Sequence, residues 1–497
     1  MSPRSSGILL HVTSLPGPYG IGTMGADARN FVDFLQSAGQ SYWQILPLVP
    51  TGQGNSPYMS PSSAAGNPWL IDLDALAEDG LLTPMELESA RLDTPDRVDF
   101  DFLERTRLPL LRRAFGRLTQ EQKEAVAAFA AEQAAWLEDY ALFMACHEMF
   151  GLPFNQWPDK SLVRRHKKAL EKYRKDLSED IRFHQFLQYT FYTQWHALKR
   201  YANSKGVKII GDIPFYVSGD SVDVWVSPKL FQVDQDCHAK LVAGVPPDLF
   251  TEDGQFWGNP LYNWKQHAKD GYQWWCGRIR QCMAFYDVIR IDHFRGIDSY
   301  WEIPVEAKSA KEGCWRTGPG MKLIEAFRKQ VPAAEFIAED LGDLTPSAIQ
   351  FVKDSGLPGM RVLTDAFNDL SGSSDFLPHR CVKGAVMYTG THDTPTFLEW
   401  LFDTAKEPQR QYAMDYLRLN DKEGFGWGVV AGAWSSVCDL AMAPFQDVLG
   451  LGADARMNTP GTTGSHCWSW RVRRDAFNGE VAHKLCHLTW VYGRLNR

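Results

Sequence analysis

Four acidic side chains in this 497-residue chain each lie within or directly after a short apolar run. They are Asp212, Asp292, Glu339 and Asp393, the last of which follows His392. One carboxylate can attack a carbon atom as a nucleophile, while a second carboxyl group gives and takes back a proton. A single such acid is usually a helix cap or a solvated loop residue. Four of them in the same setting predict one shared catalytic site.

Asp292 and Glu339 have different neighbours. Side chains alternate along a strand, so Arg290 and Asp292 should point to one face while the isoleucines at 289 and 291 point to the other. A nearby positive charge favours the ionised form of a carboxyl group. Glu339 follows an apolar stretch, and burial raises the pKa of a carboxyl group. We therefore expect an ionised Asp292 beside a protonated Glu339, a pair that can cleave a glycosidic bond.

The elements that must position these acids are eight apolar runs, most of which are followed by a helical pattern. Near-continuous apolar runs that alternate with helices indicate parallel strands covered on both faces, and eight of them predict a (β/α)8 TIM barrel. In such a barrel the reacting groups lie at the carboxyl ends of the strands, where the four acids fall. The runs span 7–15, 41–48, 207–215, 287–294, 335–342, 359–366, 385–393 and 446–454.

The second and third runs are too far apart for one crossover helix. The intervening residues are rich in Ala, Leu, Glu, Lys and Arg, with apolar residues at helical spacing. We expect residues 1–73 to form the first part of the barrel with strands one and two. Residues 74–205 should then form a large, mainly helical insertion after the second strand. Residues 206–497 should complete the barrel with strands three to eight and the active-site loops, without a separate C-terminal β domain.

Composition excludes several classes of protein. The 52 Lys and Arg against 60 Asp and Glu give a net charge of -8, and no dense basic cluster suggests a nucleic-acid partner. No segment approaches the roughly 20 consecutive apolar residues of a membrane span. The nine cysteines are odd in number and show no metal-ligand spacing, which favours free thiols in a reducing cytoplasm. Nothing in the sequence indicates an oligomeric state.

Longer segments carry a resemblance to a known family. RIDHFRG, AEDLG and THD resemble signatures of the α-amylase clan. GDIPFYVSGDSVDVW and GVPPDLFTEDGQFWGNPLYNW are similar to amylomaltases, glycoside hydrolase family 77, as are PLVPTGQGNSPYMSPSSAAGNPWLIDLD and RMNTPGT. The likeness runs from about Gly7 to Arg471. It implies a 4-α-glucanotransferase that moves α-1,4-glucan segments from a maltooligosaccharide or glucan donor to the 4-OH of an acceptor sugar. It also implies a retaining double displacement through a covalent intermediate.

The resemblance also implies roles for single residues. Asp292 would be the nucleophile, Glu339 the general acid and base, and Asp393 the group that stabilises the transition state. The family needs no metal and no organic cofactor. The glucan-binding positions that it implies are Tyr58, Asp212, Asp248, Trp257, Arg290, His392 and Asn458.

A Gly- and Pro-rich segment, 244–260, reads as a loop that could close over the site. Its glycines allow movement, its two consecutive prolines stiffen it, and Phe250, Phe256 and Trp257 supply apolar cover. Closure excludes water, so we expect this loop to favour a sugar acceptor over hydrolysis.

Two places depart from the family pattern. The sequence has Thr364-Asp365-Ala366-Phe367 where related sequences commonly have Gln-Phe-Ala-Phe, and Ser465-His466-Cys467 before Trp468. These departures bear on acceptor preference and product size rather than on the cleavage chemistry.

Three other functions compete with this interpretation. Gly20, Gly22 and Gly25 match the GxGxxG pattern of dinucleotide-binding enzymes, but two prolines separate them from the preceding apolar run and leave no room for a tight phosphate turn. An α-amylase-like hydrolase would share the acidic segments. A non-catalytic sugar-binding protein would keep the aromatic residues but would have no reason to keep Asp292, Glu339 and Asp393 together.

Overall fold

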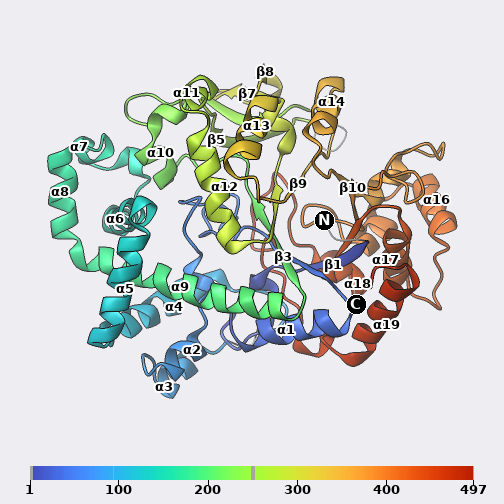
Figure 1. Cartoon of the computed structure of the whole chain (residues 1–497), viewed down its shortest axis with the longest axis horizontal. Coiled ribbons are helices and arrows are strands. Elements are labelled where there is room, and N and C mark those ends of the chain that lie inside the picture. Colours follow the sequence, from blue (N-terminus) through green and yellow to red (C-terminus); the bar gives the residue numbers. More distant parts are fainter. Residues whose placement is uncertain (1–3, 93, 248–251, 496–497) are drawn as a thin grey trace.

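An eight-stranded parallel sheet curls into a barrel at the centre of the molecule (Figure 1). The computed structural model describes residues 4–92, 94–247 and 252–495. The strands pair in the order β10-β11-β12-β1-β2-β3-β6-β9, and a parallel bridge between Ala338 and Gly359 brings the two edges together. The predicted (β/α)8 barrel is confirmed. Its strands are β1 (Ser5–Leu9), β2 (Tyr42–Gln44), β3 (Lys208–Ile213), β6 (Val288–Ile291), β9 (Phe336–Ala338), β10 (Met360–Val362), β11 (Val386–Tyr388) and β12 (Leu440–Pro444).

Alternating side chains fill the barrel and its outer surface. Tyr42, Ile210 and Met442 belong to one buried cluster inside the ring, whereas Trp43, Ile209 and their equivalents join a larger cluster that also contains helix side chains. Both faces of each strand are therefore buried, which is why the strands read as continuous apolar runs.

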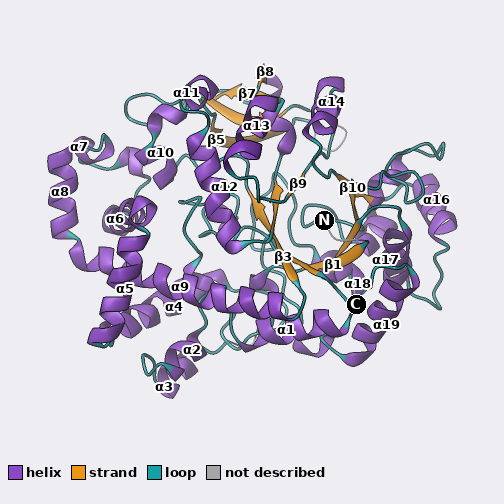
Figure 2. Ribbon diagram, in the orientation of Figure 1, coloured by secondary structure: helices purple, strands orange, loops and turns teal. Residues whose placement is uncertain are grey.

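Helices surround the barrel on its outer face (Figure 2). They cover the apolar side chains that point away from the ring. The helices that follow or flank barrel strands are α1 (Ala26–Ser37), α10 (Val222–Val226), α11 (Trp264–Lys269), α12 (Gln273–Phe285), α13 (Met321–Gln330), α14 (Pro346–Ser355), α15 (Phe397–Glu399), α16 (Glu407–Leu417), α17 (Phe425–Ser435), α18 (Phe445–Val448) and α19 (Gly479–Val491).

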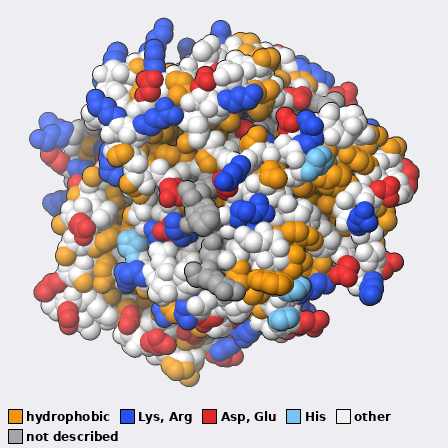
Figure 3. Space-filling view, turned by 45° about the vertical axis from the view of Figure 1, so that its right-hand side comes forward, with side chains coloured by type: hydrophobic (Ala, Val, Ile, Leu, Met, Phe, Trp, Pro, Cys, Tyr) orange, Lys and Arg blue, Asp and Glu red, His pale blue; other side chains and the backbone are white. Residues whose placement is uncertain are grey.

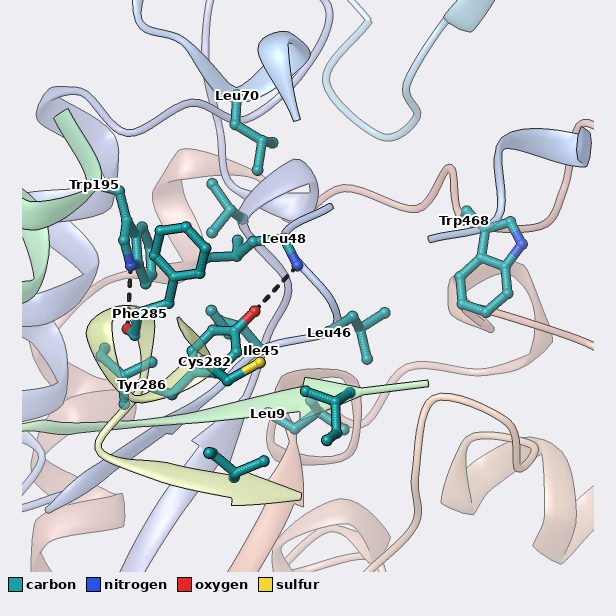
Figure 4. Packing of buried hydrophobic residues seen from close by; sticks show 14 of the residues in the cluster. Leu9, Ile45, Leu46, Leu48, Leu70, Trp195, Cys282, Phe285, Tyr286 and Trp468 are labelled. Carbon is teal, nitrogen blue, oxygen red and sulfur yellow. Dashed lines mark hydrogen bonds between the residues drawn. The ribbon is translucent and has the colours of Figure 1, made fainter. Parts of the chain in front are cut away.

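Eight further helices lie between β2 and β3. Most of them gather beside the barrel, at the left of Figure 1, and the longest, α9, leads directly into β3. The Trp195 indole of α9 donates to the Phe285 carbonyl of α12 at 3.1 Å, so α9 also packs on the barrel wall (Figure 4). These helices are α2 (Leu73–Glu78), α3 (Pro84–Ser89), α4 (Phe100–Gly116), α5 (Gln120–Glu132), α6 (Ala134–Phe150), α7 (Lys160–Val163), α8 (Lys167–Asp176) and α9 (Ser178–Ser204).

The predicted eighth strand, at 446–454, is wrong. Strand β12 lies earlier, at Leu440–Pro444, and the chain turns into α18 directly after it. Proline has no N–H to give to a continuing ladder, and the Asp447 side chain binds the backbone of a neighbouring loop. The apolar residues at 448–451 therefore lie at the end of a helical turn and just after it, and they do not extend the strand.

A small antiparallel sheet, not predicted, stands above the carboxyl ends of β3 and β6. Its order is β5-β4-β7-β8, with β4 (Leu241–Val245), β5 (Gln255–Pro260), β7 (Ser299–Pro304) and β8 (Cys314–Thr317). β4 and β5 pair with Gly244 opposite Phe256. The prediction of a simple loop at 244–260 is therefore wrong at both ends, which are the two strands of a hairpin. Phe250 lies outside the described residues.

The GxGxxG segment does not form a phosphate turn. After β1 the chain makes a short 3-10 helix at Val12–Ser14, and a Cβ on Gly22 would lie 2.0 Å from the Val12 carbonyl oxygen. That glycine allows two backbone segments to approach closely. Because all eight barrel strands form one ring, the dinucleotide-binding alternative is wrong.

Lys and Arg side chains are interspersed with Asp and Glu over the face drawn in Figure 3. Among the described residues, no helix combines the length and the apolar character needed to cross a membrane.

Candidate active site

Arg290 binds three carboxylates inside the barrel mouth. Its Nη1 lies 2.5 Å from Asp212 Oδ2 and 3.3 Å from Asp292 Oδ1, and its Nη2 lies 3.2 Å from Glu339 Oε2. Asp212 comes from β3, Arg290 from β6, and Glu339 directly follows β9. These three strands are neighbours, so the barrel itself brings the charges together. Arg290 and Asp292 share a face, as the alternation predicts.

The pKa shifts of Asp292 and Glu339 have the opposite directions from those expected. Burial and the charge of Glu339 raise the pKa of Asp292 well above its ordinary value, and Arg290 only partly opposes them. Burial also works to raise the pKa of Glu339, but Arg290 and the backbone N–H of His293, 2.5 Å from Oε2, bring it below its ordinary value. The sequence places Arg290 beside Asp292 but cannot reveal that the guanidinium also contacts Glu339.

Tyr58 and His392 cover one side of this cluster. The Tyr58 hydroxyl donates to Asp212 Oδ2 at 2.7 Å and also lies 2.8 Å from His392 Nε2. The two rings are stacked, with centroids 5.4 Å apart. The ring of Trp468 packs against both, at 5.7 Å from Tyr58 and 6.1 Å from His392. Burial, with the charge of Asp212, raises the pKa of Tyr58, so its hydroxyl stays protonated.

Asp393 follows β11 and is about one-third exposed. Its Oδ1 accepts from Asn458 Nδ2 at 2.6 Å, and its Oδ2 lies 3.3 Å from His392 Nε2. Arg456 donates to its backbone carbonyl at 3.2 Å. These contacts hold the carboxylate at the rim while leaving part of it open to a ligand.

Asp447 holds the segment that carries His392 and Asp393. It accepts from the Thr389 hydroxyl at 2.6 Å and from the Phe397 N–H at 2.7 Å, at the two ends of that segment. Burial raises the pKa of Asp447 to about 6. Asp447 follows β12, but it lies near the start of the run at 446–454. The misplaced eighth strand therefore put it at the wrong end of the barrel.

Trp257 contacts the site by packing against His293. The Trp257 ring meets the His293 ring edge to face at 4.9 Å, and His293 in turn donates its backbone N–H to Glu339. His293 adopts a left-handed backbone conformation with φ of 43°, and burial lowers its pKa to about 4. A non-glycine residue in this region is strained, and such strain is typical of catalytic sites. The predicted glucan-binding position Asp248 lies outside the described residues.

Three residues of the site were not predicted from the sequence, although two of them lie next to segments that were singled out. His293 stands next to Asp292 in the IDHF motif, and Trp468 adjoins one of the departures from the family pattern. Asp447 had no signal beyond its acidic side chain within an apolar run. At the other departure, burial raises the pKa of Asp365, which follows β10 at the same rim, to about 6.

The described residues include no group of three or more His, Cys, Asp or Glu side chains placed to hold a metal ion. Arg290 instead balances the acidic cluster. An acid-and-nucleophile pair with a second carboxylate at the rim can break and re-form an acetal bond at a sugar ring.

Comparisons with known proteins agree with this chemistry. A family model described as 4-alpha-glucanotransferase matches residues 10–476. The 4-alpha-glucanotransferase of Clostridium butyricum is 43% identical over 488 residues, covering 98% of this chain and 100% of that protein. That of Thermus thermophilus is 44% identical over 499 residues, covering 97% of each.

Solved structures agree as well. The amylomaltase from Streptococcus agalactiae in complex with acarbose superposes with a TM-score of 0.96 at 40% identity, covering 99% of this chain and 100% of that one. The amylomaltase from Corynebacterium glutamicum shares the fold, with a TM-score of 0.80 at 19% identity, over 98% of this chain and 75% of that one. The chain therefore belongs to the 4-alpha-glucanotransferases of glycoside hydrolase family 77.

Proposed function

We propose that this enzyme transfers α-1,4-glucan segments from a maltooligosaccharide or glucan donor to the 4-OH of a glucose or oligosaccharide acceptor, with Asp292 as nucleophile. One observation carries the assignment. Arg290 binds Asp292 and Glu339 at once, which joins the two groups that a glycoside-cleaving pair requires. The family membership supplies the substrate class.

The first half of the reaction breaks the donor bond. As positive charge develops on the anomeric carbon, it stabilises the ionised form of Asp292, so the proton needed for departure is carried by Glu339. Glu339 then gives this proton to the departing glycosidic oxygen while Asp292 attacks the carbon. The products are a covalent glycosyl ester on Asp292 and a shortened sugar with a new hydroxyl group.

The second half reverses these roles. Glu339, now ionised, removes the proton from the acceptor 4-OH, and the oxygen displaces Asp292 from the anomeric carbon. Inverting enzymes need carboxyl groups roughly 6.5–9.5 Å apart to admit a water molecule between them. Arg290 lies 3.3 Å from Asp292 and 3.2 Å from Glu339, which keeps the two carboxyl groups near one another and supports the double displacement with retention.

The remaining groups would bind sugar hydroxyls. Asp393 offers a partly exposed carboxylate held by Asn458, and Tyr58 and His392 form a stacked wall beside it. We assign Asp393 to stabilising the distorted sugar in the transition state. Tyr58, Asp212, Asp248, Trp257, Arg290, His392 and Asn458 are the proposed glucan-binding positions.

Segment 244–260 is proposed to favour transfer over hydrolysis by shielding the ester from water. The contact of Trp257 with His293, next to Asp292, supports this role. If shortening the hairpin left the ratio of transfer to hydrolysis unchanged, this part of the proposal would fail.

Incubation with maltotriose alone tests the main proposal. Transfer yields longer oligosaccharides plus glucose with a constant number of reducing ends, because each bond broken is replaced by one formed. A steady rise in reducing ends would instead indicate an α-amylase-like hydrolase. Binding without turnover would indicate a non-catalytic sugar-binding protein.

Two further expectations stay proposals. The division at 73/74 and 205/206 is supported by the helices that lie between β2 and β3. A cytoplasmic location is supported by the nine free cysteines.

A further inference from the structure

Two cysteines lie side by side at the end of the barrel opposite the catalytic residues. Cys381 precedes β11 and Cys438 precedes β12, whereas Asp393 follows β11 at its other end. The two sulfur atoms are 3.0 Å apart. Both side chains are buried, with exposed fractions of 5% and 0%.

The backbone holds the two cysteine segments in a fixed register. The Val437 N–H donates to the Pro378 carbonyl at 3.2 Å, and the Asp439 N–H donates to the Lys383 carbonyl at 2.7 Å. One backbone hydrogen bond therefore lies on each side of the sulfur pair. A disulfide needs two backbones held close together in a suitable orientation, and this arrangement supplies the proximity.

The C-terminal region fixes the Cys438 segment further. The buried guanidinium of Arg494 donates to the carbonyl of Cys438 at 3.0 Å and to that of Ser436 at 3.0 Å. This side of the pair is therefore rigid.

The pKa of Cys381 is shifted in favour of its thiolate form. The hydrogen bond from the Cys438 thiol, aided by the backbone N–H groups of Val437 and Cys438, outweighs burial and lowers the pKa of Cys381 to about 7. Thiolates, not thiols, attack peroxides and disulfides. Burial instead raises the pKa of Cys146 and Cys282. The pKa of Cys381 is thus shifted in the opposite direction from those of these two cysteines and from that of its partner Cys438.

Only a thin layer of chain covers the pair. Val382 is 59% exposed and Val437 is 43% exposed, and the residues on either side of Cys381 are exposed. Cys381 keeps an exposed fraction of 5% and Cys438 has none, so a reagent that reaches the pair has to be small.

We propose that Cys381 and Cys438 form a modification site at which a small peroxide joins them in an intramolecular disulfide. The Cys381 thiolate attacks one peroxide oxygen, giving a sulfenic acid and, after proton uptake, one molecule of water or alcohol. Cys438 loses its proton and attacks the Cys381 sulfur, which forms the S–S bond and releases a molecule of water. In total, two thiols are oxidised to one disulfide and one peroxide is reduced.

This bond would close the chain segment from 381 to 438, which contains β11, the Asp393 segment and α17. Closing a long segment restricts the unfolded chain, so the oxidised enzyme should resist heat better. Catalysis should not change, because the bond forms at the amino-terminal ends of the strands.

The test starts from reduced, full-length enzyme treated with hydrogen peroxide near neutral pH. After unreacted thiols are alkylated, peptide mass spectrometry should find Cys381 joined to Cys438 with the loss of two hydrogens. The Tm should rise by at least about 3 °C and return to its starting value with dithiothreitol. The rate of maltotriose disproportionation should stay within about twofold of that of the reduced enzyme.

Two variants serve as controls. Cys381→Ser should show neither the cross-link nor the rise in Tm, while Cys314→Ser, which removes an exposed cysteine, should keep both. Sulfinic acid on Cys381 without a cross-link, or a cross-link through a different cysteine, would overturn the assignment. The cross-link in the native sequence is decisive even if Cys381→Ser does not fold.

Discussion

Arg290 and Asp212 form an ion pair of 2.5 Å in which neither side chain is more than 2% exposed. They are direct partners in the β3–β6 register, so the strand pairing sets their geometry. The same guanidinium also contacts Asp292 and Glu339. Asp212 therefore holds Arg290 in place, and the positive charge of Arg290 favours the ionised form of both reacting carboxyl groups.

Asp212→Asn should lower both stability and activity. Removing one partner of a buried ion pair costs up to about 3–5 kcal/mol, and the cost here should lie below that limit because Arg290 keeps its contacts with Asp292 and Glu339. We also expect kcat/KM on maltotriose to fall about 100-fold, since Arg290 is no longer held in place. Denaturant unfolding and initial rates measure the two effects. As a control, Asp180→Asn, which breaks a partly exposed pair with Arg112, should cost less than about 1 kcal/mol. Equal losses in the two variants would contradict this role.

Asp292→Asn should abolish turnover while leaving glucan binding largely intact. An amide cannot form the glycosyl ester, so kcat should fall by at least about 10⁴-fold. Calorimetric titration with a maltooligosaccharide measures the binding that remains. An active Asp292→Asn enzyme would refute the assigned nucleophile.

Glu339→Gln should lower the pKa of Asp292. The charge of Glu339 is the second cause of the raised value after burial, and glutamine carries no charge. In the unmodified enzyme, kcat/KM should follow a bell-shaped pH profile. The value of kcat/KM should fall at low pH, when the Asp292–Glu339 pair takes up a second proton. It should also fall at high pH, when the pair loses its only proton. NMR titration of ¹³C-labelled aspartate, compared with Glu339→Gln, follows Asp292 directly, and an unshifted titration would contradict the coupling.

Asp447→Asn should change how stability depends on pH. The pKa of Asp447 is raised to about 6 in the folded state, so its contribution is fully present below about pH 4 and is lost as pH rises through 6. The unfolding free energy of Asp447→Asn, relative to the unmodified enzyme, should therefore increase by about 2 kcal/mol between pH 4 and pH 7. Unfolding curves across this range provide the measurement. If the unfolding free energies of the two proteins changed with pH in parallel, the Asp447 carboxyl group could not be the cause of the pH dependence.

Asn458→Ala should affect activity much more than stability. It removes the 2.6 Å hydrogen bond to Asp393, which we expect to lower kcat/KM by about 10- to 100-fold. Asn458→Asp would place a second negative charge beside Asp393 and should be worse. Rates on maltotriose and Tm values separate the effects, and a loss of stability without a loss of rate would argue against a role in positioning Asp393.

Local sequence patterns predicted what depends on neighbouring residues in the chain. The apolar runs located seven barrel strands, and strand alternation put Arg290 and Asp292 on one face. The eighth strand was misplaced because the apolar residues that follow Leu440–Pro444 mimic a strand while packing in a helical turn.

What the sequence could not predict depends on contacts between distant segments. The antiparallel sheet pairs strands from two different barrel loops, 241–260 and 299–317. The opposite pKa shifts of Asp292 and Glu339 depend on a contact of Arg290 with Glu339, which lies 49 positions further along the chain. Trp468 meets Tyr58 only after the barrel has closed.

The pairing of β1 with β12 has a consequence for how the chain folds. Ser5 pairs with Leu440, so the first strand has only one neighbour, β2, until almost the entire polypeptide has been synthesised. A ribosome adds roughly 5–20 residues per second, which leaves one edge of β1 unpaired for tens of seconds. Contacts between such distant segments slow folding, and an open edge can pair with another chain. Closing the barrel should therefore be a late step in biogenesis, and the nascent chain is most prone to aggregate before that step.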